Sequence, residues 1–506
     1  MRFPGPATEP APFLADDADV PELRKAVSEI AHAGYAEAIV RERLGLADLA
    51  DIRWKASSIY REERLKERDP LAVAIDLFLL QGSARAEEVG RLLSAPARAA
   101  MLRTGFLSMD SAGLVRAGAT LYPVGERLIF SDHAWHKLPH PGYKEVPSDQ
   151  VMFVGTDSRW LARATVRRPV QRTLDLCTGS GIQALLAAQH SERVLAVDIS
   201  PRAARCARCN ARILGANNLE VVVGDVYDAV GAEERFDLIL ANPPFVPSPV
   251  DDLRFRDGGR SGEAVQQRIV AGLPRHLAAG GIAQMVTEVG ERDGEPAIQR
   301  VRQWLGDAPM DIYMVRLRTF SAEDYAIGHG KGDGDYGAYL ESVRAWACNL
   351  KAQGYVRIVA MLIAFQWSDL ALGPSWDRVD ESLPPRPGAG ADVEAAFSSE
   401  RGWRRNPTKV APKNYRVRRA GPIALTESQV LGRPIRAATR AVLLGRALTV
   451  EHQLDWPETE LLRGLDQALP LSELFRIAGE LGIEEEAAAA AIDSLHRRGL
   501  ICVTPS

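Results

Sequence analysis

The chain is poor in cysteine, has no long hydrophobic run and carries little net charge. Five cysteines in 506 residues are too few for a disulfide framework, which agrees with a reducing compartment. The longest apolar stretch, residues 358–365, has the length of a strand, whereas a membrane helix needs roughly 20 apolar residues. The N-terminal segment lacks the basic start and apolar centre of a secretory signal. We therefore expect a cytoplasmic protein that does not enter a membrane.

Length and composition indicate a globular protein with several domains. Hydrophobic residues make up 46% and charged residues 25% of the chain, which excludes a fibre and general disorder. One hydrophobic core usually serves roughly 100 to 200 residues, so a chain of 506 residues predicts about two to four domains. The net charge of -4 says little about partners.

The N-terminal part, residues 1–142, is predicted to be a helical and winged-helix-like module. After a proline-rich start, Leu23, Val27 and Ile30 follow helical spacing. Three helices and two short β-runs then succeed one another, as they do in a winged helix. The predicted helices cover 69–80, 86–93 and 97–103, and the β-runs lie near 114–115 and 121–122.

Residues 143–370 are predicted to form an α/β domain with a Rossmann-like sheet of seven strands. Strand-like and helix-like segments alternate here, which is typical of a parallel sheet covered on both faces. Residues 321–352 contain a glycine-rich turn and a helix, and we expect them to be an insertion between the last two strands. The predicted strands cover 173–177, 194–198, 219–223, 236–241, 282–288, 310–317 and 356–367.

The C-terminal part is predicted to contain a linker, residues 371–442, and a second winged-helix-like module, residues 443–506. Proline and glycine dominate the start of the linker, and such residues rarely lie inside regular structure. Three helices are expected at 458–469, 471–481 and 484–498. The last of these begins with three glutamates, which suit a helix N-terminus but repel phosphate. Protein recognition or scaffolding is therefore the favoured role of the terminal modules.

The second half of the predicted linker is strongly basic. Between Arg401 and Arg419 there are eight basic residues and no acid. Trp403 and Tyr415 are interleaved with them, and arginine neutralises phosphate while aromatic rings stack on bases. The run is thus a candidate contact for RNA, DNA or the ribosome. A solvated tail, or a strap across the enzyme surface, is the open alternative.

A glycine-rich turn, LDLCTGSG at 174–181, follows the first predicted strand and precedes a helix. Ligands of doubly wound sheets bind at this edge, outside the carboxyl ends of the strands. Gly179 and Gly181 lack a Cβ, so the backbone can come close to a ligand. The helix N-terminus favours a carboxylate, and Asp175 could hold an ammonium group. The turn therefore predicts a site for a cofactor that joins a nucleoside to an amino acid.

Two further acids sharpen this prediction. Asp198 ends the second predicted strand, a position from which a carboxylate can accept both ribose hydroxyls. Asp225 follows the third predicted strand and could receive the amino group of an adenine. A hydrogen bond to such a carboxylate contributes about 1.5 to 3 kcal/mol. The alternative is that both acids only cap the ends of strands.

The tetrapeptide Asn242-Pro243-Pro244-Phe245 follows the fourth predicted strand and is the most specific motif of the chain. The Asn242 side-chain oxygen and the Pro243 carbonyl offer two acceptors to a planar NH2 group, and hold it as positive charge develops on its nitrogen. Phe245 could stack on this flat group. The two prolines stiffen the turn, which favours the alignment that group transfer requires. The motif predicts transfer of a small group to a planar nitrogen.

With these motifs, residues 151–367 resemble class I methyltransferases of the HemK type, the group that contains N5-glutamine and N6-adenine methyltransferases. LDLCTGSG, VLAVDIS, VVVGD and ANPPF match the motifs of that group in order, with Cys177 where many members have glycine. The resemblance implies methyl transfer from S-adenosylmethionine, with catalysis by the tetrapeptide at 242–245. The cofactor-binding residues that it implies are Asp175, Cys177, Thr178, Gly179, Gly181, Asp198, Ile199, Asp225, Val226 and Asn242.

No metal site is expected. His133, His136 and His140 lie close together, but the prolines beside them indicate a loop, and metal sites recruit ligands from fixed elements. Cys206 and Cys209 have metal-ligand spacing without a second pair, which favours a packed face of a helix.

We thus expect an S-adenosylmethionine-dependent N-methyltransferase with a macromolecular substrate. The favoured acceptor is a glutamine side-chain amide of a protein of the translation machinery. An exocyclic amine of a base in RNA or DNA is the first alternative. A small natural product as the acceptor, or a protein that only binds the cofactor, also stays open.

Overall fold

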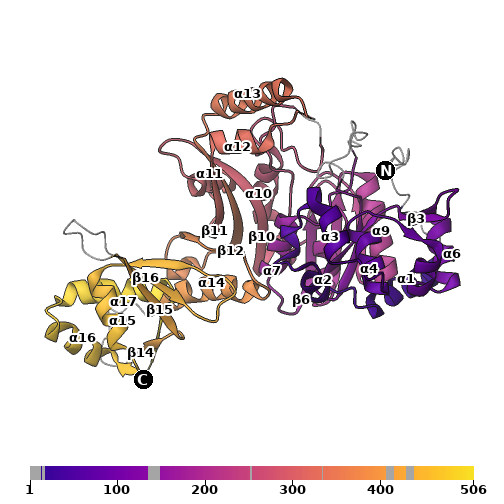
Figure 1. Ribbon diagram of the computed structural model, residues 1–506. Helices are drawn as coiled ribbons and strands as arrows, with labels where there is room; N and C mark the ends of the chain where they lie inside the picture. The colour runs from indigo at the N-terminus through magenta and orange to yellow at the C-terminus, as the bar shows by residue number, and fades with distance from the viewer. Residues whose placement is uncertain are drawn as a thin grey trace.

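The structure is a computed structural model that describes residues 13, 17–134, 149–250, 253–332, 334–405, 415–428 and 438–505. Figure 1 shows the N-terminal helices and the C-terminal module at opposite ends of the molecule, with the large sheet between them. Among the described residues, no helix combines the length and the apolar character that crossing a bilayer requires.

The N-terminal part consists of short helices around a three-stranded sheet of order β1-β3-β2. Asp69 caps α4, because its side chain accepts a hydrogen bond from the Ala72 amide, and α4 continues as the short helix η3. The helices and the β-wing lie close to the predicted positions. The elements are α1 (Val20–His32), α2 (Glu37–Leu44), η1 (Leu49–Asp51), η2 (Trp54–Ala56), α3 (Ser57–Glu63), α4 (Pro70–Ala74), η3 (Ile75–Leu79), β1 (Ala84–Arg85), α5 (Ala86–Leu92), α6 (Ala95–Arg103), β2 (Leu107–Met109) and β3 (Leu114–Ala117).

A separate hairpin, β4 (Thr120–Val124) and β5 (Arg127–Ser131), joins this part to the large sheet. The predicted β-run near 121–122 thus belongs to this hairpin and not to the wing. Asn210 of helix α9 (Pro201–Leu214) accepts a hydrogen bond from the Phe130 amide at 3.0 Å and donates one to its carbonyl at 2.8 Å. The N-terminal part and the α/β domain therefore share one core on this side.

The two cysteines of α9 lie in this shared core. Cys206 and Cys209 are both buried, which confirms the prediction of a packed helix face. His133 is also buried, and its ring contacts the Thr120 hydroxyl at 2.7 Å and the Ala117 carbonyl at 3.0 Å. Burial lowers the pKa of His133 to about 4. His136 and His140 lie outside the described residues.

The α/β domain contains an eight-stranded sheet of order β13-β11-β12-β10-β9-β6-β7-β8. All seven predicted strands are present, and β13 is an eighth that lies parallel to β11 at the edge. β12 is antiparallel to both of its neighbours, while β10, β9, β6, β7 and β8 run parallel. The strands are β6 (Val170–Leu176), β7 (Ser191–Asp198), β8 (Leu219–Val223), β9 (Phe236–Ala241), β10 (Leu277–Glu291), β11 (Met310–Ser321), β12 (Arg357–Trp367) and β13 (Asp377–Glu381).

Helices cover both faces of this sheet, as the alternating pattern predicts. One face packs against α7 (Thr156–Ala164), α8 (Ile182–Ala187), α9 and α14 (Ala389–Arg405). The other face packs against α10 (Ala264–His276) and α11 (Ala297–Leu305). Since β6, β7, β8 and β9 are parallel, the segments that follow them meet at one edge of the sheet.

The segment 321–352 is an insertion between β11 and β12, as predicted. It forms α12 (Ala322–His329) and α13 (Tyr336–Ala352), which Figure 1 shows above the upper ends of these strands. Tyr325 and Trp346 of the insertion pack with Val246, just after β9. The insertion therefore lies at the same edge of the sheet as the glycine-rich turn and the tetrapeptide at 242–245.

The stretch 371–442 differs from the predicted linker, because most of its described residues are in regular structure. Residues 377–381 form β13 of the large sheet, and 389–405 form α14, which packs on the same sheet. Apolar residues of α14 such as Val393 and Phe397 are buried there, a pattern that the flanking prolines and glycines obscured. A short helix, η5 (Leu370–Leu372), precedes β13.

The C-terminal module contains two three-stranded sheets and three helices close to their predicted positions. The sheets have the orders β18-β14-β19 and β15-β16-β17. The elements are β14 (Tyr415–Arg419), β15 (Ile423–Ser428), β16 (Ala438–Leu443), β17 (Glu451–Leu454), α15 (Trp456–Gly464), β18 (Leu469–Pro470), α16 (Leu471–Glu480), α17 (Glu485–Arg497) and β19 (Ile501–Pro505).

The described arginines of the basic run are engaged within the chain. Arg401 contacts the Gln366 side chain, and Arg404 pairs with Glu400 at 3.1 Å. Arg419 donates to the Leu462 carbonyl at 2.8 Å. These contacts favour the hypothesis that the basic run is a strap across the enzyme surface over the hypothesis that it is a solvated tail. Contact of the run with nucleic acid or the ribosome stays a prediction. Lys409 and Lys413 lie outside the described residues.

A buried ion pair fixes the N-terminal part to the α/β domain. Arg202 of α9 donates two hydrogen bonds to Asp132, at 2.5 and 3.1 Å, and the two side chains are 6% and 5% exposed. Burial raises the pKa of Asp132, and Arg202 opposes this rise. Because both charged side chains are buried away from water, each needs the opposite charge beside it to offset the cost of burial.

We predict that Arg202→Ala lowers the free energy of unfolding by about 3 to 5 kcal/mol, because it leaves a buried carboxylate without its partner. Urea unfolding followed by tryptophan fluorescence measures this loss. The control is Arg476→Ala, which removes an exposed pair with Glu473 and should cost far less, because solvent screens such a pair. Equal losses in the two variants would contradict the assignment.

Candidate active site

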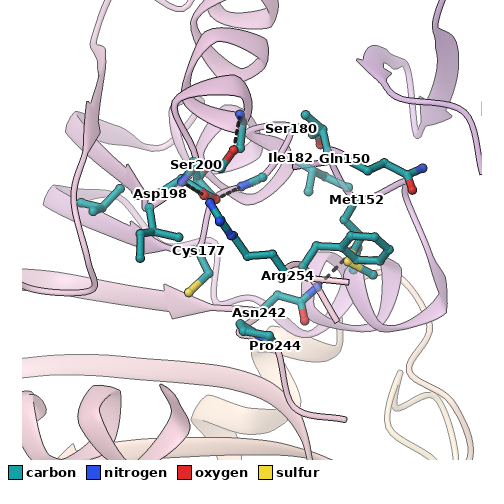
Figure 2. Close-up of a pocket in the computed structure, with 18 of the residues that line it drawn as sticks. Gln150, Met152, Cys177, Ser180, Ile182, Asp198, Ser200, Asn242, Pro244 and Arg254 are labelled. Atoms are coloured by element: carbon teal, nitrogen blue, oxygen red, sulfur yellow. Dashed lines mark hydrogen bonds between the residues drawn. The ribbon is translucent and has the colours of Figure 1, made fainter. Parts of the chain in front are cut away.

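A cavity of about 480 Å³ opens at the carboxyl ends of β6, β7, β8 and β9. This volume lies within the range of roughly 300 to 1,000 Å³ that small-molecule sites occupy. Figure 2 shows Cys177, Asp198, Asn242 and Pro244 around this one cavity. The two motifs that the sequence singles out, the glycine-rich turn and the tetrapeptide at 242–245, therefore face the same space.

The glycine-rich turn forms one wall of the cavity through Cys177, Thr178 and Gly179. Gly179 has a positive φ of 58°, and a Cβ at this position would meet no atom within 4 Å. Its amide donates a hydrogen bond to Asp198 at 2.8 Å. Cys177 also has a positive φ of 59°, which is rare for a residue with a side chain. The backbone is thus exposed to a ligand at Gly179.

Gly181 lies behind the turn and does not line the cavity. Its φ is +84°, and a Cβ would lie 3.1 Å from the Ala207 Cβ of α9. The close approach that this glycine permits is therefore between α8 and α9, and not between backbone and ligand. The structure thus places Gly181 behind the cavity wall, whereas the sequence predicted direct contact with a cofactor.

Asp175 is buried beneath the turn and does not line the cavity either. One carboxylate oxygen accepts hydrogen bonds from the Thr178 hydroxyl at 2.5 Å and from the Ala184 amide at 3.0 Å. The other, Oδ1, has no hydrogen-bond partner among the described residues. Burial raises the pKa of Asp175 to about 7. From this position Asp175 supports the glycine-rich turn. The position does not favour the predicted contact with an ammonium group.

Asp198 and Asp225 present their side chains at the cavity wall. The Asp198 carboxylate accepts the Gly179 amide on one oxygen and the Ser200 amide, at 2.8 Å, on the other. These bonds orient both oxygens and leave lone pairs toward the cavity. Burial raises the pKa of Asp198. Asp225 pairs with Arg268 at 2.9 Å and is more exposed.

An apolar residue directly follows each of these acids in the chain. Ile199 and Val226 line the cavity, and Ile199 is 50% exposed although it is a large aliphatic residue. Val226 has a positive φ of 54°, and such strain in a β-branched residue is unusual and often marks a functional site. This wall of the cavity suits a flat, apolar ring.

Asn242 follows β9 and lies at the cavity with its amide orientation fixed. Its Nδ2 donates hydrogen bonds to the Asp157 carboxylate at 3.0 Å and to the Ser158 hydroxyl at 3.1 Å. Both partners belong to the first turn of α7. Because these acceptors take the NH2 end, the Oδ1 end is left to accept a hydrogen bond from a ligand.

The other three residues of the tetrapeptide do not all face the cavity. Pro244 lines the cavity, whereas Pro243 is buried and Phe245 packs against the insertion with Tyr325 and Trp346. The predicted stacking of Phe245 on a ligand in the cavity therefore does not match the position of its ring. The reason is that the insertion buries apolar surface against Phe245.

The sequence reasoning missed Phe153, Asp157, Ser158, Arg254 and Phe255. Phe153 and Phe255 supply the aromatic rings of the cavity wall, and Ser158 and Arg254 also line it. Figure 2 shows the Arg254 side chain extending across the cavity toward Asp198. The one local signal for these residues was the Asp157-Ser158 pair at the start of α7, just before β6. This signal is weak, because Asp and Ser are common at the starts of helices in general.

A second carboxyl group lies close to Asp157. Glu288 of β10 accepts a hydrogen bond from the Tyr325 hydroxyl of the insertion at 2.5 Å. Burial raises the pKa of Glu288 to about 7, and repulsion from Asp157 adds to this rise. The surroundings of Asn242 are therefore acidic on the side of α7 and β10.

Comparison with known proteins gives a match to a family model and several similar relatives. The family model described as the methyltransferase small domain matches residues 154–301. A release factor glutamine methyltransferase of Bordetella pertussis is 36% identical over 168 residues, which are 31% of this chain and 59% of that protein. A protein of Methanocaldococcus jannaschii, assigned provisionally as a protein N5-glutamine methyltransferase, is 30% identical over 146 residues, which are 27% of this chain and 73% of that protein.

A nucleic-acid enzyme also matches. The tRNA1(Val) (adenine(37)-N6)-methyltransferase of Porphyromonas gingivalis is 36% identical over 120 residues, which are 21% of this chain and 47% of that protein. The chain thus spans 59% of the Bordetella protein and about half of the Porphyromonas protein.

The buried carboxyl of Asp175 generates a prediction about pH. Its pKa is about 7 in the folded protein, against 3.8 for an ordinary aspartate, so between these values the folded state holds a proton that the unfolded state releases. The contribution of this group to stability is complete below pH 3.8 and is lost as the pH rises through about 7.

We expect the unfolding free energy of Asp175→Asn to fall less steeply than that of the wild type between about pH 4 and 7. The difference should amount to a few kcal/mol, because one pKa unit corresponds to about 1.4 kcal/mol. Denaturant unfolding at a series of pH values measures it. Glu288, whose pKa is raised in the same direction, should maintain some slope in the variant. Identical slopes in the two proteins would refute the prediction.

Proposed function

We propose that this chain methylates the side-chain amide of a glutamine. The premise is that the chain belongs to the family of S-adenosylmethionine-dependent methyltransferases that contains the protein N5-glutamine methyltransferases. The acceptor glutamine lies in a protein of the translation machinery. The matched relatives that act on release factors support this choice.

The observation that carries the proposal is the orientation of Asn242 at the cavity. Its NH2 group is held by Asp157 and Ser158, so its oxygen faces outward as a fixed acceptor. A fixed acceptor at this place selects a ligand group that donates a hydrogen bond, and a primary amide NH2 does so. The glycine-rich turn lies on the same cavity.

The cavity residues fit S-adenosylmethionine, which supplies an electrophilic methyl group when bound. The two oriented oxygens of Asp198 would accept the ribose hydroxyls, and Ile199 and Val226 would contact the adenine. Asp225 would receive the adenine amino group. The exposed backbone of Gly179 would approach the amino-acid part of the cofactor.

Asn242 and its neighbours would prepare the acceptor nitrogen. An amide nitrogen is a poor nucleophile because its lone pair is delocalised. When Asn242 Oδ1 accepts a hydrogen bond from one of its N–H groups, the nitrogen gains electron density, and the positive charge that develops during transfer is stabilised. The nitrogen–methyl bond would form as the methyl group leaves the sulfur, and the nitrogen would then release one N–H proton to solvent. The Asp157 carboxylate behind Asn242 strengthens this effect through the Nδ2 hydrogen bond. Phe153 and Phe255 would exclude water from the reacting groups.

An exocyclic amine of a nucleobase is the second candidate acceptor. Such an amine also presents a planar NH2 to Asn242, and the Porphyromonas relative acts on an adenine of tRNA. The engagement of Arg401, Arg404 and Arg419 within the chain weighs against it, because these side chains would otherwise contact phosphate.

The parts outside the α/β domain would recognise the acceptor. We propose that residues 1–142 and 443–506 are winged-helix-like modules that contact protein, joined to the catalytic domain, residues 143–370, in a cytoplasmic enzyme. The stretch 371–442 then acts as a structured connection.

The first prediction concerns the cofactor. Asp198→Asn should weaken binding of S-adenosylmethionine by about 10- to 150-fold, because a hydrogen bond to a carboxylate contributes roughly 1.5 to 3 kcal/mol. Isothermal titration calorimetry measures the affinity. Asp228→Asn is the matched control, since Asp228 is an exposed residue outside the cavity wall. Equal affinities of both variants would argue against the assigned ribose contact.

The second prediction concerns the acceptor. Asn242→Ala should abolish transfer of a tritiated methyl group to a cell lysate while it changes cofactor affinity little, since only the grip on the acceptor is removed. Protease treatment of the lysate before the assay should remove the labelled product of the wild type, and RNase treatment should not.

Other outcomes identify the other candidates. Loss of label after RNase alone indicates a nucleobase acceptor, and label that survives both treatments indicates a small molecule. Cofactor binding by the wild type without any transfer indicates a protein that only binds the cofactor. Full turnover by Asn242→Ala would refute the mechanism.

A further inference from the structure

The insertion holds the loop that carries the tetrapeptide. Asn349 of α13 donates hydrogen bonds to the Pro247 carbonyl at 3.1 Å and to the Arg260 carbonyl at 2.9 Å. Tyr325 and Trp346 pack with Val246 on the inner side of the insertion. These contacts place α12 and α13 directly beside the segment that begins at Asn242.

The outer end of the insertion exposes a cluster of apolar and aromatic side chains, the insertion tip, which consists of Ile327, Tyr336 and Tyr339. Ile327 is 53% and Tyr336 is 72% exposed. The Tyr339 hydroxyl donates to the Ile327 carbonyl at 3.2 Å, and the Tyr339 ring stacks on Tyr336 with 6.3 Å between centroids. Tyr339, which is half-buried, thus links the exposed residues Ile327 and Tyr336.

Burial elsewhere in the insertion does not account for these side chains. The apolar residues that stabilise the two helices, such as Trp346 and Leu350, face inward and are buried. Exposing Tyr336 at the first position of α13 contributes nothing to that core. The insertion contacts the loop after Asn242, and exposed tyrosine on such an element is typical of the residues that dominate protein interfaces.

The charge of the insertion selects the class of partner. By sequence, residues 322–352 contain five carboxylates and three basic groups. A net negative segment repels the phosphates of RNA and DNA, whereas a protein surface imposes no such cost. An apolar, slightly acidic surface thus fits a protein acceptor.

We infer that the insertion tip is the docking surface for the methyl-acceptor protein, an inference that rests on the proposed function. The acceptor protein contacts Ile327 and Tyr336 while its glutamine side chain reaches Asn242. Docking at this place leaves the cofactor site unchanged, because none of the three tip residues lines the cavity.

The experiment uses the full chain, tritiated S-adenosylmethionine and the RNase-treated protein fraction of a lysate as the probe. The initial rate of labelling is measured over a range of protein concentrations for the wild type, Ile327→Ser and Tyr336→Ala. We expect the concentration for half-maximal rate to rise at least about tenfold in both variants, with an unchanged maximal rate and unchanged cofactor affinity.

Leu370→Ala is the matched control. Leu370 is 61% exposed, but it follows β12 at the opposite edge of the sheet, and its removal should leave the rate unchanged. Circular dichroism and cofactor affinity test whether each variant is folded, and both substituted tip residues are exposed, so folding should be retained.

The remaining outcomes separate the two hypotheses. If the wild type labels protein and the tip variants do so at the same concentrations, docking at the tip is refuted and the proposed function stands. A fall in maximal rate alone also refutes docking, because it indicates altered chemistry. If the wild type labels no protein, the proposed function fails, and the docking surface fails with it.

Discussion

Two hydrogen bonds from the Asn242 side chain, to Asp157 and Ser158, connect the end of β9 to the first turn of α7. A carboxamide has a donor end and an acceptor end of nearly equal shape, and without these partners it could turn either end toward a ligand. The bonds decide that the oxygen faces the cavity. The chemistry that we assign to the site depends on this choice, because a donor in the same place would repel an NH2 group.

The insertion between β11 and β12 provides the second constraint. Asn349 and the aromatic residues around Trp346 hold the segment after Asn242, so the loop does not depend on its two prolines alone for stiffness. Preorganised groups stabilise developing charge without reorganising during the reaction. In the proposed mechanism the insertion thus positions the loop that carries Asn242, and the proposed docking surface lies at its outer end.

The cavity wall and the residues beneath it include groups that weaken the folded state. Asp175 is buried, and its Oδ1 has no hydrogen-bond partner among the described residues, while Cys177 and Val226 adopt positive φ angles. Each of these features costs free energy, and such costs gather at functional sites where the surrounding structure maintains them. Here the buried cores on both faces of the sheet provide that support.

The sequence by itself determined the α/β sheet, its seven predicted strands, the insertion and the residues at the two motifs. It could do so because strand and helix periodicities and loops such as 177–181 depend on neighbours in the chain. Only the tertiary structure decided that Gly181 faces α9, that Phe245 packs on the insertion and that Asp157 and Ser158 orient Asn242. These facts depend on contacts between residues more than 80 positions apart or on the packing of whole helices, and no local pattern encodes such contacts. The same reason explains β13 and α14, whose apolar residues become a core only when the large sheet is present.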